Sequence, residues 1–160
     1  MAVSYPWLAL ESRRDPEKQW ITWAVRMKLD LSGIRIGLGH WQALTESDRD
    51  RLHDFRVENR SDAESFKKLL LACMPKSFAE IEAAIDRESA QRYWDSLSGR
   101  NLPDSVQALI EQWNLDLDWK RLNLFGRYVF CAIAEKRNPE DYKEDAKALL
   151  SSPEFSLLAA

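Results

Sequence analysis

The chain has 160 residues, of which 45% are hydrophobic and 31% charged, with a formal net charge of −3. A chain of this length buries about 70% of its unfolded surface on folding, which predicts one sizeable core. Its composition is that of a globular protein and not of a disordered chain. The acidic balance provides no basic footprint for phosphates, which disfavours nucleic-acid binding. We expect an irregular lead-in over residues 1–19, a single helical domain over residues 20–150 and a tail over residues 151–160.

The N-terminus and the two cysteines indicate a cytoplasmic protein. Met1 to Leu10 lacks a basic leader region, and no stretch approaches the roughly 18 apolar residues that a membrane span needs. Cys73 and Cys131 lie in apolar stretches and form no C-x-x-C pair. They are typical of buried thiols in a reducing compartment.

The first predicted helix covers residues 20–31. Its apolar residues also alternate as in a strand, but Trp20, Trp23 and Met27 follow helical spacing. Gly33 fits a left-handed helix end at which Ile34 folds back onto the last turn. The segment is therefore predicted to be a helix.

Capping patterns then predict three further helices. Thr45 with Asp48 caps a polar helix that reaches about Glu58, after a helical stretch that begins at Trp41. Two S-x-x-E capping boxes, Ser61-Glu64 and Ser77-Glu80, open the next two helices, and Gly99 closes the second of them.

Three helical segments follow after Gly99. Pro103 is placed for the first turn of one helix, and Asn138-Pro139 begins the last. Between them, residues 119–136 form the strongest predicted helix, which is almost wholly apolar. Gly126 in this helix would let a neighbouring helix approach closely. The chain is predicted to be an all-α bundle of about seven helices.

Two segments share a sequence pattern that suggests a duplicated helix pair. Gly33-Ile34-Arg35-Ile36 leads to Trp41, Leu44, Arg49 and Leu52, and Asn114-Leu115-Asp116-Leu117 leads to Trp119, Leu122, Arg127 and Phe130. Asn is the second choice after Gly for a left-handed helix end. Chance remains an alternative explanation, because Leu and Ile are common.

No catalytic or metal-binding pattern is found, so we predict no metal, no cofactor and no catalytic residue. The two histidines, His40 and His53, are 13 positions apart, and His53 lies in a charged helix that we expect to be solvated. The acidic residues from Glu46 to Asp54 alternate with arginines, which is typical of a solvated helix face.

The candidate contact residues are Arg26, Lys28, Asp30 and Trp41. The three charges interrupt an apolar helix, where a charge is costly unless it reaches water or a partner. Either Arg26 pairs with Asp30 while Lys28 extends to water, or the three form a docking strip. Structural anchors are expected at Gly33, Trp119 and Arg127, the last because a buried guanidinium needs oxygen acceptors.

The chain resembles the conserved nitrate reductase-associated protein family of bacteria. The family's V-R-[FY]-K-L-D-x-x-G-I-K-L-x-L-x-x-W-x-x-L core is matched from Val25 to Leu44, and its later W-x-x-L-x-x-x-x-R-[FY] segment from Trp119 to Tyr128. Met27 replaces the usual aromatic residue, and Gly126 stands where Gln is common. The resemblance is good over residues 20–73 and 113–136.

This resemblance implies a role in assimilatory nitrate reduction and a partner, nitrate reductase or its assembly machinery. We expect a non-enzymatic accessory factor that acts in assembly, maturation or regulation by protein contact. The alternative is a small enzyme or ligand-binding module with a Trp-lined pocket, for which a concave cavity with convergent polar groups would be evidence. A homodimer remains open. A nucleic-acid-binding regulator is disfavoured by the acids between Arg49, Arg51, Arg56 and Arg60.

Overall fold

The computed structural model describes residues 5–74, 80 and 84–159, and in these residues the only extended pairing is one isolated bridge, between Leu122 and Ala159. The all-α prediction is therefore confirmed. Nine α-helices are described in these residues, and seven of them have seven residues or more. The α-helices are α1 (Ala9–Arg14), α2 (Trp23–Ser32), α3 (Leu38–Ala43), α4 (Glu46–Asp54), α5 (Arg60–Cys73), α7 (Arg87–Ser98), α8 (Asp104–Trp113), α9 (Leu124–Ala134) and α10 (Lys143–Ser151). Short 3-10 turns are η1 (Trp119–Arg121), η2 (Pro139–Tyr142) and η3 (Pro153–Leu157).

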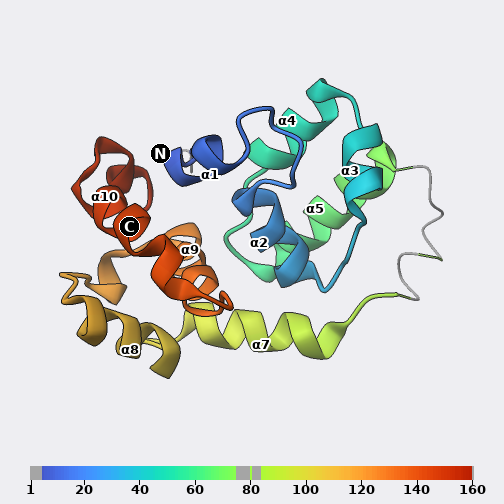
Figure 1. Cartoon of the computed structure of the whole chain (residues 1–160). Coiled ribbons are helices and arrows are strands. Elements are labelled where there is room, and N and C mark those ends of the chain that lie inside the picture. The colour runs from blue at the N-terminus through green and yellow to red at the C-terminus, as the bar shows by residue number, and fades with distance from the viewer. Residues whose placement is uncertain (1–4, 75–79, 81–83, 160) are drawn as a thin grey trace.

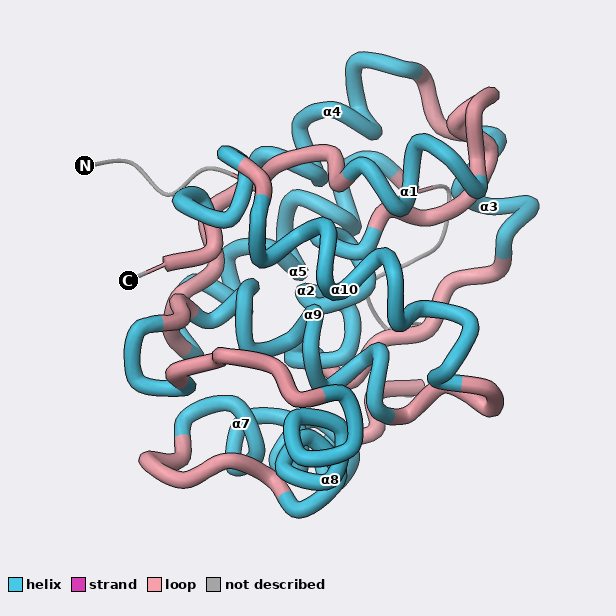
Figure 2. Tube along the Cα trace, turned by 60° about the vertical axis from the view of Figure 1, so that its left-hand side comes forward, coloured by secondary structure: helices cyan, strands magenta, loops and turns pink. Residues whose placement is uncertain are grey.

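Helix α2 lies near the middle of the fold, and α4, α5, α7 and α9 pack around it (Figure 1). The tube of Figure 2 shows the same arrangement from another side, with α2 again near the centre. Its inward residues belong to one hydrophobic cluster that extends along the chain from Tyr5 to Leu158. This central position makes the ends of α2 the reference points for the surrounding helices.

Both ends of α2 follow from its sequence. Thr22 is the N-cap, and its hydroxyl accepts a hydrogen bond from the Val25 N–H at 3.2 Å. The helix thus begins three residues later than the predicted start. At the other end Gly33 has a φ of 71°, and the Ile34 N–H donates to the Leu29 carbonyl at 3.0 Å, as predicted.

The helices after α3 differ from prediction in their starts and ends. Thr45 caps α4 as expected, by accepting from the Asp48 N–H at 3.1 Å, but α4 ends at Asp54 and not near Glu58. Asn59, not Ser61, caps α5, because its side chain accepts from the Asp62 N–H at 2.9 Å. Asn59, two residues before Ser61, thus takes the role assigned to the capping box.

A separate cap also shortens the helix that ends near Gly99. Asp86 accepts from the Ser89 N–H at 2.9 Å and opens α7 at Arg87, so one continuous helix up to Gly99 is wrong. The predicted cap at Ser77 lies outside the described residues. Gly99 follows the helix as predicted, with a φ of −65°.

The strongest predicted helix, residues 119–136, is broken near its start. Leu122 is extended, and Asn123 caps α9 by accepting from the Gly126 N–H at 2.8 Å. The Asn123 N–H donates to the Leu158 carbonyl at 2.8 Å, and its side-chain amide donates to the Leu157 carbonyl. The C-terminal segment thus supplies the partners that turn the chain at this point.

The described residues near both ends of the chain pack against the helices, in contrast to the expected irregular lead-in over residues 1–19 and tail over residues 151–160. Residues 9–14 form α1, and Leu8 before it and Leu10 within it are buried. Leu158 is fully buried and lies against Gly126. The close approach that Gly126 permits is therefore that of the C-terminal segment and not of another helix.

The two segments of the proposed duplication have the same local backbone. Asn114 ends α8 with a φ of 52°, and the Leu115 N–H donates to the Ile110 carbonyl at 3.0 Å, as Gly33 and Ile34 do at the end of α2. In each copy a short Trp-bearing turn leads to an extended Leu, a polar N-cap and a second helix. The sequence echo thus reflects a repeated local structure.

We predict that Gly126→Ala destabilises the fold. A Cβ at Gly126 would lie 2.5 Å from the Leu158 carbonyl oxygen, which is backbone and yields little. Overpacking of this kind costs about 1–3 kcal/mol and outweighs the gain in helix propensity of about 1 kcal/mol. Thermal or urea unfolding measures the loss.

The matched control is Gly39→Ala, also in a helix, where an added Cβ meets no atom of the described residues within 4 Å. This variant should be neutral or up to about 1 kcal/mol more stable. Equal effects of the two substitutions would contradict the close approach at Gly126.

Candidate functional site

Lys28 is fully buried, so it cannot present its side chain to a partner in this structure. Its ammonium donates to the Leu52 carbonyl at 2.9 Å and to the His53 carbonyl. These carbonyls belong to the last turn of α4, where no intrahelical N–H reaches them. The ammonium also lies 3.9 Å from the centre of the Tyr5 ring. Burial lowers the pKa of Lys28 to about 7, against a smaller opposing effect of Asp54.

His53 is also buried, which corrects the expectation that it is solvated. Its two ring nitrogens lie 2.9 Å from the Thr22 hydroxyl and 2.7 Å from the Tyr5 carbonyl. Burial lowers the pKa of His53, and the nearby Lys28 ammonium acts in the same direction. His53 therefore connects α4 to the start of α2 and to the N-terminal segment.

The four candidate contact residues are not brought together. Trp41 is 2% exposed and packs in the core. Asp30 is partly buried and accepts from the Tyr128 hydroxyl at 2.6 Å, so it is bound to α9. Of the four, only Arg26 is exposed. Arg26, Lys28 and Asp30 therefore do not form one docking strip, because Lys28 points into the interior, on the side of α2 opposite to Arg26.

The three expected anchors each contact backbone. Arg127 donates to the carbonyls of Leu97, Gly99 and Trp119 at 2.8–3.3 Å, which supplies the oxygen acceptors that its guanidinium requires. Trp119 is buried, and its indole N–H donates to the Gly99 carbonyl at 3.1 Å. A Cβ at Gly33 would collide with the Asp86 backbone.

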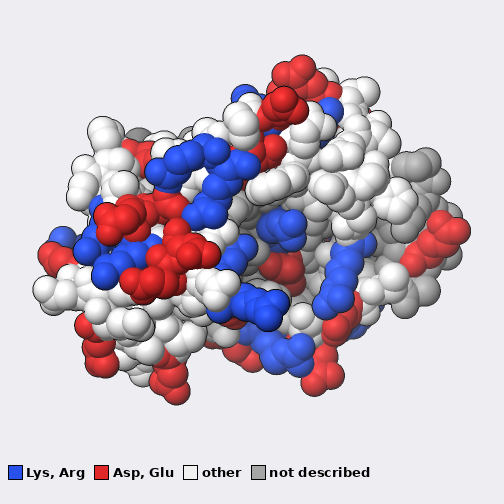
Figure 3. Space-filling view, viewed as in Figure 1, with Lys and Arg blue, Asp and Glu red and all other residues white. Residues whose placement is uncertain are grey.

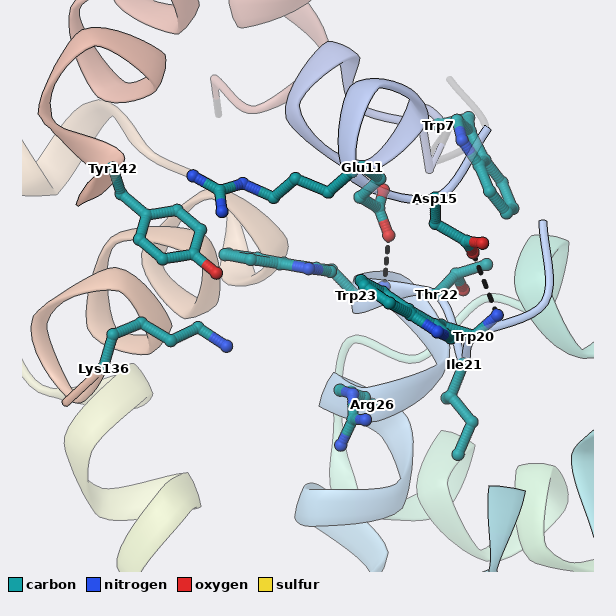
Figure 4. Close-up of a pocket in the computed structure, with 11 residues that line it drawn as sticks. Trp7, Glu11, Asp15, Trp20, Ile21, Thr22, Trp23, Arg26, Lys136 and Tyr142 are labelled. Carbon is teal, nitrogen blue, oxygen red and sulfur yellow. Dashed lines mark hydrogen bonds between the residues drawn. The ribbon is translucent and has the colours of Figure 1, made fainter. Parts of the chain in front are cut away.

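A cavity of about 310 Å³ opens beside the N-terminal end of α2 (Figure 4). Its wall comes from α1 and the segments on either side of it, from α2, and from η2 and the turn that joins α9 to η2. The residues that line it are Trp7, Glu11, Arg14, Asp15, Trp20, Ile21, Thr22, Trp23, Arg26, Lys136 and Tyr142. Such a concave cavity with convergent polar groups is the usual form of a binding site.

Two carboxylates fix the backbone on the α1 side of this cavity. Glu11 is buried and accepts from the Leu8 N–H at 3.0 Å and from the Trp23 N–H at 2.6 Å, so it joins the N-terminal ends of α1 and α2. Asp15 accepts from the Gln19 and Trp20 N–H groups, both at 2.9 Å. Burial raises the pKa of Glu11 to about 7, against the lowering effect of its two backbone donors.

Cations and aromatic rings face each other across the opening. Arg14 lies 3.9 Å from the Tyr142 ring centre and donates to Asp145 at 3.0 Å. The Lys136 ammonium lies 5.1 Å from the Trp23 ring and 5.6 Å from the Tyr142 ring. Figure 3 shows Lys and Arg side chains near the middle of the face seen in Figure 1, with Asp and Glu side chains among them. We call Trp20, Trp23, Arg26, Lys136 and Tyr142 the aromatic–cationic pocket.

Sequence reasoning found only Arg26 of this pocket. Trp20 was assigned to a helix, although Asp15 followed by Pro16 is a signal for a turn that could have placed it in a loop. Lys136 and Tyr142 lie more than a hundred residues from α2, and no local pattern relates them to Trp23. Their meeting depends on the packing of α9 against α2.

Other sites were sought in the part of the chain that the structure describes. There, no group of three or more His, Cys, Asp or Glu side chains is arranged to hold a metal ion. Within the same residues no helix is long and apolar enough to cross a membrane. Cys131 is buried as expected, whereas Cys73 is partly exposed, and neither forms a disulfide.

We predict opposite outcomes for charge reversal at two positions of α2. Lys28→Glu places a carboxylate against two carbonyl oxygens in the interior, and breaking a buried charged contact costs roughly 3–5 kcal/mol. Arg26→Glu changes an exposed charge and should stay within about 0.5 kcal/mol. Thermal midpoints of the two variants test this. A wild-type midpoint for Lys28→Glu would contradict the buried position of the ammonium.

We predict that Glu11 makes stability depend on pH. Its pKa is about 7 in the folded chain against an ordinary value of 4.5, so between these values only the folded state keeps the proton. The contribution of Glu11 is therefore fully present below pH 4.5 and is lost as pH rises through 7.

The measurement is urea unfolding of the wild type and of Glu11→Gln, which cannot titrate, at several pH values across this window. The free energy of unfolding of the wild type, relative to Glu11→Gln, should fall by up to about 3 kcal/mol as pH rises. A difference that grows with pH would instead show that the two backbone N–H donors dominate and hold Glu11 ionised.

Comparison with known proteins identifies one family. The family described as conserved nitrate reductase-associated protein matches residues 9–149, which include both Trp-bearing segments and every residue of the aromatic–cationic pocket. No curated protein and no solved structure gives a match.

Proposed function

Because this chain belongs to the conserved nitrate reductase-associated protein family, we propose that it is a non-enzymatic accessory factor for assimilatory nitrate reductase. It acts in assembly, maturation or regulation of the reductase through protein contact. Family membership is the observation that carries this proposal, since the family's description links its members to nitrate reductase. Nitrate reductase or its assembly machinery is the proposed partner.

The surface beside α2 supports action by contact. Trp20 is 52% exposed, and the exposed Arg26 lines the same cavity. Trp and Arg are the residue types that most often dominate the energy of protein interfaces, because each combines a large contact area with a polar group. This surface replaces the strip of Arg26, Lys28 and Asp30 as the candidate contact region.

A ligand-binding module is the second candidate, and the cavity itself favours it. Trp7, Trp20 and Trp23 line a concave space of about 310 Å³, and burial raises the pKa of Glu11 to about 7. Shifted pKa values in a cavity are a known sign of functional sites. Against catalysis, both oxygens of Glu11 already accept backbone hydrogen bonds, so this carboxyl group has a structural role.

The proposed function is tested in cells that carry the gene. We expect the tagged chain, purified from nitrate-grown cells, to enrich the nitrate reductase polypeptide over an untagged control. Deletion of the gene should remove most of the reductase activity while the amount of reductase polypeptide, measured by immunoblot, stays the same. If the reductase is not enriched and its activity survives deletion, the chain is not an accessory factor for it.

A further inference from the structure

We propose that the aromatic–cationic pocket is the docking point for a short acidic segment of the partner protein, in which a carboxylate side chain is followed by an aromatic or aliphatic one. This inference rests on the proposed function, since it requires that the chain act through protein contact. It names the chemistry of the partner and the residues that recognise it.

Two cations of the cavity form no ion pair with a carboxylate in the described residues, although the charge of Arg26 acts against the burial that raises the pKa of Asp30. Arg26 is on α2 and Lys136 follows α9, yet both line one cavity. Within the described residues no Asp or Glu forms an ion pair with either of them, whereas Arg14 is held by Asp145. The pKa of Lys136 is lowered first by burial and then by Arg26 and Arg14, as expected where like charges gather. A carboxylate from outside would relieve this repulsion.

The carboxylates inside the cavity do not supply this counter-charge. Each oxygen of Glu11 accepts a backbone hydrogen bond, from Leu8 and from Trp23. Asp15 is used in the same way by the N–H groups of Gln19 and Trp20. Glu11 thus holds the N-terminal ends of α1 and α2 together, and Asp15 holds the loop that carries Trp20. Neither carboxylate forms an ion pair with Arg26 or Lys136 in the residues that the structure describes.

The rings provide an apolar surface next to these charges. Trp20 is exposed at the rim, and the Trp23 and Tyr142 ring centres are 6.1 Å apart with the Lys136 ammonium near both. A carboxylate bound by Arg26 and Lys136 would place the following side chain of its segment against these rings. The volume, about 310 Å³, is near the lower end for ligand cavities and suits one or two side chains.

A neighbouring cavity differs from the aromatic–cationic pocket in the charges that line it. A space of about 480 Å³ shares Trp7 and Thr22 with the first, but four carboxylates line it against two cations. The acids are Glu17, Glu46, Asp50 and Asp54, and the cations are Lys18 and Arg49. Because this rim is acidic, a carboxylate segment would be repelled there. Charge complementarity thus selects the aromatic–cationic pocket.

The first experiment measures binding of purified nitrate reductase by calorimetry. The pocket variant Arg26→Glu/Lys136→Glu should bind at least about tenfold more weakly than wild type. The control Lys68→Glu/Arg100→Glu makes the same change in charge at two exposed residues outside the cavity and should bind like wild type. Equal binding of the pocket variant and wild type would overturn the inference while leaving the proposed function intact. Failure of the wild type to bind counts against the proposed function.

The second experiment tests the pocket without the reductase. The probes are the capped dipeptides acetyl-Asp-Phe-amide and acetyl-Asn-Phe-amide, and the readout is the indole N–H signals of Trp20 and Trp23 in ¹H–¹⁵N spectra. The Asp probe should shift both signals in a saturable way, the Asn probe should not, and the pocket variant should lose the response. Equal responses to the two probes, or none to either, would overturn the inference.

Titrations with sodium acetate and sodium phosphate test whether the pocket binds free anions or an acidic peptide segment. If they shift the signals as strongly as the Asp probe, the pocket takes free anions and not an acidic peptide segment, and the inference is wrong. The folding of each variant is checked by its thermal midpoint, which should match wild type because the substituted residues are exposed.

Discussion

The buried Lys28 ammonium determines how the N-terminal half is assembled. It satisfies two carbonyls at the end of α4, where the helix dipole is negative, and no carboxylate in the described part of the chain forms an ion pair with it. The contact joins α2 to α4, and the face of the Tyr5 ring covers the ammonium from the N-terminal segment. His53, next in α4, bonds to the Thr22 hydroxyl and the Tyr5 carbonyl. Because these bonds fix the start of α2, they also fix the wall of the cavity that Thr22 lines.

In the C-terminal half a different cation bonds the unpaired carbonyls at the end of a helix. Helix α7 ends at Ser98, and Arg127 from α9 donates to the nearby Leu97 and Gly99 carbonyls. Lys28 of α2 thus bonds the carbonyls at the end of α4, and Arg127 of α9 bonds those at the end of α7. These two contacts are distinct from the repeated local pattern, in which Arg49 corresponds to Arg127. The fold thus repeats both a local backbone arrangement and the use of a basic side chain to bond the carbonyls at a helix end.

Local signals in the sequence were enough to predict the helix ends that depend on nearby residues. The stop at Gly33 and the cap at Thr45 involve partners within five positions, and both were predicted. The break before α9 was missed because Asn123 is bonded to Leu157 and Leu158, more than 30 residues away. The acceptors of Lys28 are likewise 24 and 25 residues from it. An apolar pattern indicates that a segment is buried, but it does not indicate which distant carbonyl the segment contacts.

The geometry of a helix explains why the charges on α2 do not form one surface and why Arg26 alone is exposed among them. Each residue turns the helix by about 100°, so residues two apart point to nearly opposite sides. Arg26 therefore faces the cavity while Lys28 faces the interior, and Asp30, one turn after Arg26, reaches Tyr128 on α9. A surface on this side of α2 must be completed from other elements. The loop that carries Trp20 and the α9–η2 turn that carries Lys136 complete it, and sequence spacing alone relates neither of them to Arg26.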